Sequence, residues 1–127
     1  MNVANEFRLS LSGSLFQLAQ PSKKSWAKGT LNIHGDAHIE NGASLNGALP
    51  VGSDNSSAEA YLNIDGTLYV NGGNISGGYT SLGGSGTFTA VFNLHDVFIG
   101  NGGAWNAPGI NNANNRFNFT ANATNIT

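Results

Sequence analysis

An imperfect internal repeat constrains this chain more than any other feature. Two segments open with the same Leu-Asn-Ile triplet: LNIHGDAHIENGASLNG begins at Leu31 and LNIDGTLYVNGGNISGG begins at Leu62. A third segment, FNLHDVFIGNGGAWN, begins at Phe92 and aligns with the second without a gap, so that its Asn-Gly-Gly triplet matches that of the second. Weaker copies begin at Leu9 and Phe117. A repeat of about 20–50 residues indicates a solenoid, in which each unit stacks on the next.

Each copy contains short stretches in which apolar and polar residues alternate, which is the pattern of half-buried strands. In the second copy Leu68 and Val70 fall on one face and Tyr69 on the other, and Asn71-Gly72-Gly73 then predicts a turn. The positions expected to face inward are Leu31, Ile33, Ala37, Ile39 and Leu45 in the first copy, and Phe92, Leu94, Phe98 and Trp105 in the third.

These patterns predict an all-β fold, a right-handed parallel β-helix of about five short coils. The coil is expected to span residues 1–127 as a single domain or fragment, with loops near 17–28, 50–58 and 108–115. Asn-Gly between alternating strands is also a hairpin signal, so an antiparallel β-sandwich or jelly roll is the alternative. The coil is favoured because the strands are very short and the Asn-Gly sites recur at the repeat period.

The composition suits stacked strands and excludes several classes of protein. Charged residues make up 9% of the chain, which also holds 18 Gly and many Asn. Like charges stacked in a column would repel, whereas Asn side chains can hydrogen-bond in ladders between parallel strands.

The composition also excludes several classes of site and partner. The absence of Cys excludes disulfides and Cys-based metal or redox sites, and a net charge of −2 argues against binding nucleic acid. No apolar run is long enough for insertion into a membrane as a helix.

The residues that could carry chemistry are few, and we expect neither an enzyme nor a cofactor. The alignment places His34, Asp65 and His95 at one repeat position, where they are weak candidates for a metal column; a solvent-exposed turn is the simpler interpretation. Spacing of two residues also predicts that His34, Asp36 and His38 share one face of a single strand. The seven carboxylates are scattered, so no catalytic residue is assigned.

Aromatic residues at outward positions are the candidates for ligand contact. They are Trp26, Tyr61, Tyr69 and Tyr79. Such residues stack on carbohydrates or contact proteins, but on a sheet surface they also pair across strands for stability.

Two segments resemble a family of secreted proteins. The stretches GTLNIHGDAHIENGASLNG and LNIDGTLYVNGGNISGG resemble, in their rhythm, the passenger regions of bacterial autotransporter adhesins. The tail NNANNRFNFTANATNIT resembles the repeats of vacuolating-cytotoxin-type autotransporters. The resemblance implies a β-helix displayed outside the cell and an adhesive role, and it carries over no catalytic residue.

Three functions follow as hypotheses. The first is an extracellular or cell-surface structural and adhesive β-solenoid segment, which contacts a protein or glycan receptor. The second is a self-assembling subunit of an extracellular filament, a phage fibre or a shell, located in the virion or filament, whose copies join by strand-edge stacking. The third is a carbohydrate-binding module.

Overall fold

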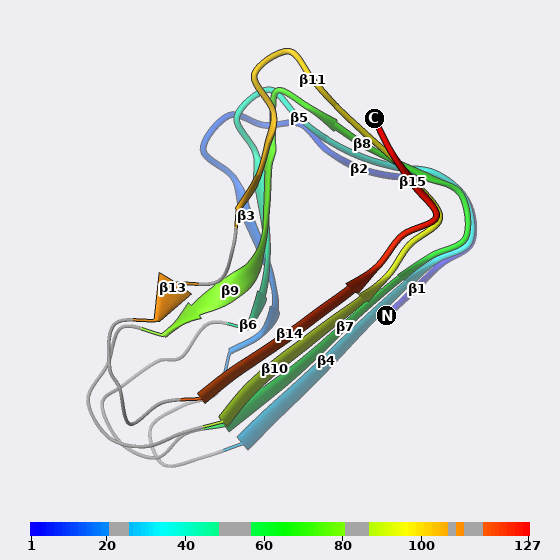
Figure 1. Ribbon diagram of the computed structural model, residues 1–127. Coiled ribbons are helices and arrows are strands. Elements are labelled where there is room, and N and C mark those ends of the chain that lie inside the picture. The colour runs from blue at the N-terminus through cyan, green and yellow to red at the C-terminus, as the bar shows by residue number, and fades with distance from the viewer. Residues whose placement is uncertain (21–25, 49–56, 81–86, 107–108, 111–115) are drawn as a thin grey trace.

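A computed structural model describes residues 1–20, 26–48, 57–80, 87–106, 109–110 and 116–127. Its strands form three parallel sheets, here called A, B and C, which make the three sides of a triangle in Figure 1. Sheet A contains β1 (Asn2–Val3), β4 (Trp26–Ile33), β7 (Ser57–Ile64), β10 (Thr87–Asn93) and β14 (Arg116–Asn122). Sheet B contains β2 (Phe7–Leu9), β5 (Ala37–Glu40), β8 (Thr67–Asn71), β11 (Asp96–Gly100) and β15 (Asn125–Ile126). Sheet C contains β3 (Leu15–Ala19), β6 (Ser44–Ala48), β9 (Asn74–Thr80) and β12 (Ala104–Asn106), and β13 (Gly109–Ile110) also pairs with β9.

The chain visits sheets A, B and C in turn and then returns to sheet A one layer further along the stack. All pairings between the described strands are parallel and join strands of successive coils, as β4 and β7 do over eight residue pairs. The predicted right-handed parallel β-helix is therefore confirmed, and the antiparallel sandwich is wrong. Asn-Gly failed as a hairpin signal because it turns the chain onto the next sheet rather than back along the same one.

Alternation of inward and outward residues along the strands builds the core. In β7 the residues alternate between half-buried and buried along the whole strand, and Leu62 and Ile64 are buried. Leu31, Leu62 and Phe92 occupy the same place in successive coils, so they form a column in the interior. Burying one such side chain contributes about 1.5–3 kcal/mol. The inward residues predicted for the first copy are all buried: Leu31, Ile33, Ala37, Ile39 and Leu45.

A repeated turn carries the chain from sheet B to sheet C. Gly42, Gly72 and Gly102 all have φ between 77° and 80°, a conformation that residues with a Cβ rarely adopt. Asn41 and Asn101 have φ of 56° and 50°, in the left-handed region that Asn tolerates. The turn predicted from the Asn-Gly pattern is confirmed, and the glycines are required there by backbone geometry.

An asparagine ladder runs along the outer side of sheet A near its end. In each coil the Nδ2 of one Asn donates to the Oδ1 of the Asn in the preceding coil, at 2.7–2.9 Å. The members are Asn2, Asn32, Asn63, Asn93 and Asn122, separated in sequence by 30, 31, 30 and 29 residues. The ladder expected from the Asn-rich composition therefore exists, and it marks the register of all five layers of sheet A.

The ladder corrects the predicted starts of the first and last copies. Asn2 pairs with Asn32, so the first coil begins at the start of the chain, whereas Leu9 pairs with Ile39 in sheet B. In the last coil Phe117 pairs with Phe88, and the residue that matches Phe92 is Ala121. Both errors arose because apolar alternation recurs on more than one sheet, so a similar pattern was assigned to the wrong strand. The true repeat is more regular than the predicted one.

Phe98 was predicted to face inward, and this is wrong. Its neighbour Val97 is buried, and Phe98 is 43% exposed. In the second coil two residues, Asp65 and Gly66, lie between the end of β7 and the start of β8. In the third coil a single residue, His95, lies between the two positions that correspond to that end and that start. One missing residue moves every following side chain of the strand to the opposite face. An additional residue at the next corner restores the register, because Ala104 again pairs with Asn74.

The other three inward predictions for the third copy agree with the structure: Phe92 and Leu94 are buried, and Trp105 packs against the core.

The predicted loops are shorter than expected where the structure describes them. Residues 17–19 belong to β3 and residues 26–28 to β4, so the loop predicted at 17–28 is wrong at both ends. Residues 57–58 belong to β7 and residues 109–110 to β13. The loop prediction extends too far because polar residues at outward strand positions, such as Lys28, resemble loop residues. The rest of the three predicted loops lies outside the described residues.

Replacing Ile64 with Asp is expected to destabilise the fold severely, by about 4 kcal/mol or more, because it places a charge in a dry interior column. Ile64 is 2% exposed. Ser57→Asp, on the outer side of the same strand, is the matched control. Urea denaturation of both variants measures the difference, and an Ile64→Asp protein as stable as the control would show that Ile64 does not face the core.

Replacing Asn63 with Ala is expected to lower the free energy of unfolding by about 1–2 kcal/mol, because Asn63 makes two ladder hydrogen bonds. Thr89→Ala, at an outer position of the neighbouring strand, is the control. Equal stability of the two variants in chemical denaturation would mean that the ladder contributes nothing to the fold.

Candidate functional site

The outer side of sheet A carries a group of aromatic and charged side chains next to the start of its strands. Trp26, the first residue of β4, is 61% exposed. The Nζ of Lys28 lies 5.2 Å from the ring centroid of Tyr61, within the range of a cation–π contact. The hydroxyl of Tyr61 donates to Oε1 of Glu59 at 3.0 Å. We call Trp26, Lys28, Glu59 and Tyr61 the sheet A patch.

The strand register explains how this patch forms. Lys28 pairs with Glu59, and Thr30 pairs with Tyr61, so the four side chains of the patch lie at alternate positions of two neighbouring strands. The hydrogen bond to the Glu59 carboxylate, together with partial burial, raises the pKa of Tyr61 above its ordinary value. The protonated hydroxyl of Tyr61 is the donor in this hydrogen bond, while Trp26 presents a large apolar surface to solvent.

A second outer group runs along sheet B through four coils. Arg8, His38, Tyr69 and Phe98 occupy one column of the paired strands. The rings of His38 and Tyr69 stack at 4.8 Å with an angle of 11° between their planes, and the rings of Tyr69 and Phe98 are 6.2 Å apart. Aromatic pairs at these separations contribute about 0.5–1.5 kcal/mol each. Because the rings of His38 and Tyr69 cover each other's faces, this column contributes mainly to the stability of the coil.

Two carboxylates meet at the start of the sheet B column. The Nε of Arg8 donates to Oε1 of Glu6 at 2.8 Å, and its Nη1 donates to Oε1 of Glu40 in the next coil. These hydrogen bonds, first that to Glu40 and then that to Glu6, raise the pKa of Arg8. The guanidinium thus neutralises carboxylates that are 34 residues apart in sequence. Sequence analysis missed this group, because it depends on the register between β2 and β5.

The histidines and the matching aspartate are only partly brought together. The Nδ1 of His34 lies 2.9 Å from Oδ2 of Asp65, and both side chains are more than half exposed. His95 occupies the corresponding corner of the third coil. Within the described ranges, no three metal-ligating side chains gather in one place. At this corner the described side chains of His34 and Asp65 would supply two ligands to a metal ion.

His34, Asp36 and His38 do not share one strand, so that prediction is wrong. β4 ends at Ile33 and β5 begins at Ala37, which leaves His34 and Asp36 in the corner between sheets A and B. Oδ1 of Asp36 accepts a hydrogen bond from the backbone N–H of Thr67 at 2.8 Å, so this carboxylate ties the corner to the next coil. The corner glycine interrupts the alternation that the prediction assumed.

The four predicted contact residues separate onto different faces. Trp26 and Tyr61 lie on sheet A, and Tyr69 lies on sheet B between His38 and Phe98. Tyr79 belongs to β9, and its side chain is outside the described part of the structure. The structure therefore brings two of the four predicted residues onto one surface.

Comparisons with protein-family models, with curated proteins and with solved structures give no match to this chain. A search of the described residues finds no helix that is long and apolar enough to span a membrane.

Replacing His34 with Ala is expected to leave both thermal stability and metal content unchanged, because the His34–Asp65 pair is exposed and screened by solvent. Elemental analysis of the purified protein and a melting curve measure the two quantities. Loss of a stoichiometric metal ion in the variant would show that the pair is part of a metal site.

Proposed function

We propose that this chain is a non-catalytic structural and adhesive β-solenoid segment, displayed outside the cell or on the cell surface, and that the sheet A patch contacts its receptor. The observation that carries the proposal is Trp26, which is exposed beside the ordered Lys28–Tyr61–Glu59 group. The rhythm shared with autotransporter passenger regions supports extracellular display.

The shape of the fold supports a display role. Three sheets stacked coil upon coil give an extended side to which each coil adds about 4.8 Å, so outer residues are held at fixed spacing. The interior is a narrow apolar core made of side chains from all three sheets. Such a scaffold is suited to presenting a surface.

The chemistry of the patch fits recognition of polar surfaces. Exposed Trp and Tyr side chains combine a large apolar area with a polar group, which is why they are enriched in binding interfaces. Glu59 supplies a hydrogen-bond acceptor and Lys28 a donor next to these rings. A carbohydrate ring or a polar protein surface could be held by stacking on Trp26 and by hydrogen bonds to its neighbours.

The proposal predicts that Trp26→Ala lowers binding to the receptor at least fivefold, with the fold unchanged. The purified chain is applied to immobilised glycans, to extracellular-matrix proteins and to intact cells. Phe98→Ala removes an aromatic of comparable exposure from sheet B and is the matched control. The absence of binding to all three probes, or equal loss in both variants, would contradict the proposal.

A further inference from the structure

The sheet A patch holds a cation and a carboxylate that are neighbours but do not pair with each other. Lys28 and Glu59 are register partners on β4 and β7. The ammonium of Lys28 lies over the ring of Tyr61, and the carboxylate of Glu59 accepts the hydroxyl of the same ring. No ion pair joins Lys28 to Glu59 in the described part of the chain. The Tyr61 side chain therefore separates the two charges.

Both charged groups keep unused hydrogen-bonding capacity. Lys28 is exposed, and its ammonium carries three N–H donors while its partner here is a ring face. Glu59 is half-buried, and Tyr61 occupies only part of the acceptor capacity of its two oxygens. The patch thus offers a charged donor and a charged acceptor side by side, and hydrogen bonds to such groups are stronger than those between neutral groups.

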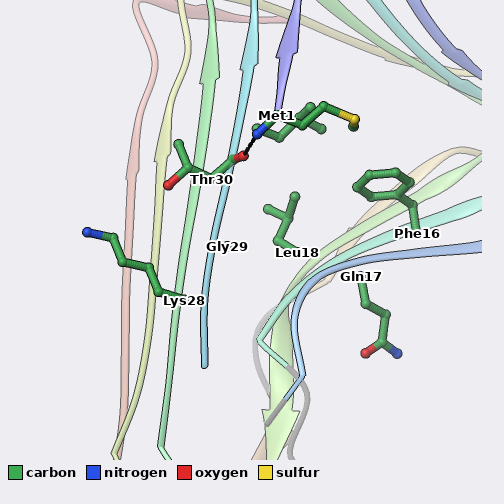
Figure 2. A pocket seen from close by; sticks show the side chains of 8 residues that line it. Met1, Phe16, Gln17, Leu18, Lys28, Gly29 and Thr30 are labelled. Atoms are coloured by element: carbon green, nitrogen blue, oxygen red, sulfur yellow. Dashed lines mark hydrogen bonds between the residues drawn. The ribbon is translucent and has the colours of Figure 1, made fainter. Parts of the chain in front are cut away.

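The aromatic surface lies on the same face as the charged pair. Figure 2 shows the side chain of Lys28 directed away from Leu18 and from the cavity that Leu18 lines on the inner side of β4. Trp26 lies two residues before Lys28 on β4, so its side chain leaves the same outer face. Positions two apart in a strand are separated by about 6.6 Å. A ligand of the size of one sugar ring is therefore sufficient to contact both Trp26 and the charged pair.

The charges of the patch balance, which indicates a ligand without net charge. Lys28 contributes one positive charge and Glu59 one negative charge. The outer residues paired with members of the patch are uncharged, namely Thr30, Ser57 and Thr89. An anionic ligand would gain from Lys28 but meet repulsion from Glu59, and a cationic ligand would meet the reverse. A neutral ligand gains from both groups.

A pyranose has the chemistry that this arrangement requires. Its C–H groups form an apolar face that packs against an aromatic ring, and Trp26 is 61% exposed. Each of its hydroxyls is both a donor and an acceptor, so two adjacent hydroxyls can donate to a carboxylate and accept from an ammonium at the same time. A stable protein–protein contact buries about 800 Å² on each partner, more than four side chains of which two are half-buried provide.

We propose that the sheet A patch binds a carbohydrate through one neutral pyranose residue that has two adjacent hydroxyls. The C–H face of the sugar lies on Trp26, one hydroxyl donates to Glu59, and the next accepts from Lys28. Tyr61 is a positioning residue, because its hydroxyl holds Glu59 and its ring face holds Lys28. The ligand is assigned to the site of the proposed function and rests on it.

The probes are immobilised oligosaccharides in matched pairs. One member of each pair ends in glucose, galactose or mannose, and the other ends in the same sugar with a carboxylate in place of its terminal CH₂OH group. We expect saturable binding to at least one neutral sugar and no tighter binding to its carboxylate counterpart. Raising sodium chloride from about 0.05 M to about 0.5 M is expected to change the affinity for the neutral sugar less than about twofold, because the ligand carries no charge.

Saturation-transfer NMR tests the stacking on Trp26. When the aromatic protons of the protein are saturated, we expect the strongest transfer to the C–H protons on one face of the bound sugar ring. Trp26→Ala is expected to abolish this pattern. The other tryptophan, Trp105, packs against the core, so its protons are not expected to contribute to it.

Variants of the charged pair test the two hydrogen bonds. Glu59→Gln keeps an acceptor for the Tyr61 hydroxyl and removes the charge, and it is expected to weaken sugar binding at least about fivefold. Lys28→Met keeps the length of the side chain and is expected to have a similar effect. Asp65→Asn removes an exposed carboxylate at the corner between sheets A and B and is the matched control, with unchanged binding. Melting curves show whether each variant is folded.

Deoxy analogues of the bound sugar separate direct contact from a structural role. One deoxy analogue is expected to bind the native chain at least about fivefold more weakly than the parent sugar. The Glu59→Gln protein is expected to bind that analogue and the parent sugar with similar affinity, because the contact is already weakened in it. A purely structural role of Glu59 gives no such coupling between one hydroxyl and one side chain.

The outcomes separate this assignment from the proposed function. Binding that depends on Trp26 but is confined to proteins, tighter binding of the carboxylate sugars, or the absence of coupling between Glu59 and any hydroxyl would overturn the neutral sugar and leave the patch as a receptor site. No binding to any probe, or self-association through Trp26 measured by sedimentation, would overturn both.

Discussion

The register between successive coils is the constraint on which the rest of the structure depends. Each residue stands next to its counterpart about 4.8 Å away along the stack, so whatever one coil places at a position is repeated in a column. Inside, this favours apolar columns such as Leu31, Leu62 and Phe92. Outside, it favours side chains that attract their own kind, and Asn does so because its amide is both donor and acceptor.

The same constraint explains the low content of charge and the places where charge occurs. A column of like charges would be unfavourable, and two of the described cations lie beside opposite charges or an aromatic ring instead. Arg8 lies between Glu6 and Glu40, and Lys28 lies over Tyr61 next to Glu59. The surface feature that carries the proposed function is a departure from the repeat, namely the exposed Trp26 on sheet A.

Much of the fold follows from the sequence, because alternation and Asn-Gly turns are local signals that recur at a fixed period. These signals located the interior columns and the turn from sheet B to sheet C. They failed where one residue more or less at a corner changes which face a strand presents, as at His95, which turned Phe98 outward. They also could not reveal the Arg8–Glu40 contact or the cavity at Leu18, since both depend on which strands lie side by side and on where the first coil begins.

Parallel register between coils is tested most directly by cross-linking introduced cysteines, because the chain has none of its own. Glu59 pairs with Thr89 and Tyr61 with Val91 in neighbouring strands. Paired Cα atoms of neighbouring strands lie within the range of about 4.4–6.8 Å that a disulfide requires. Cysteine pairs at 59/89 and at 61/91 should both oxidise efficiently within one molecule, whereas a pair at 28/89, two layers apart, should not. Efficient disulfide formation at only one of the pairs 59/89 and 61/91 would contradict parallel stacking, because two antiparallel strands can align only one of these pairs. Efficient disulfide formation at 28/89 would also contradict it.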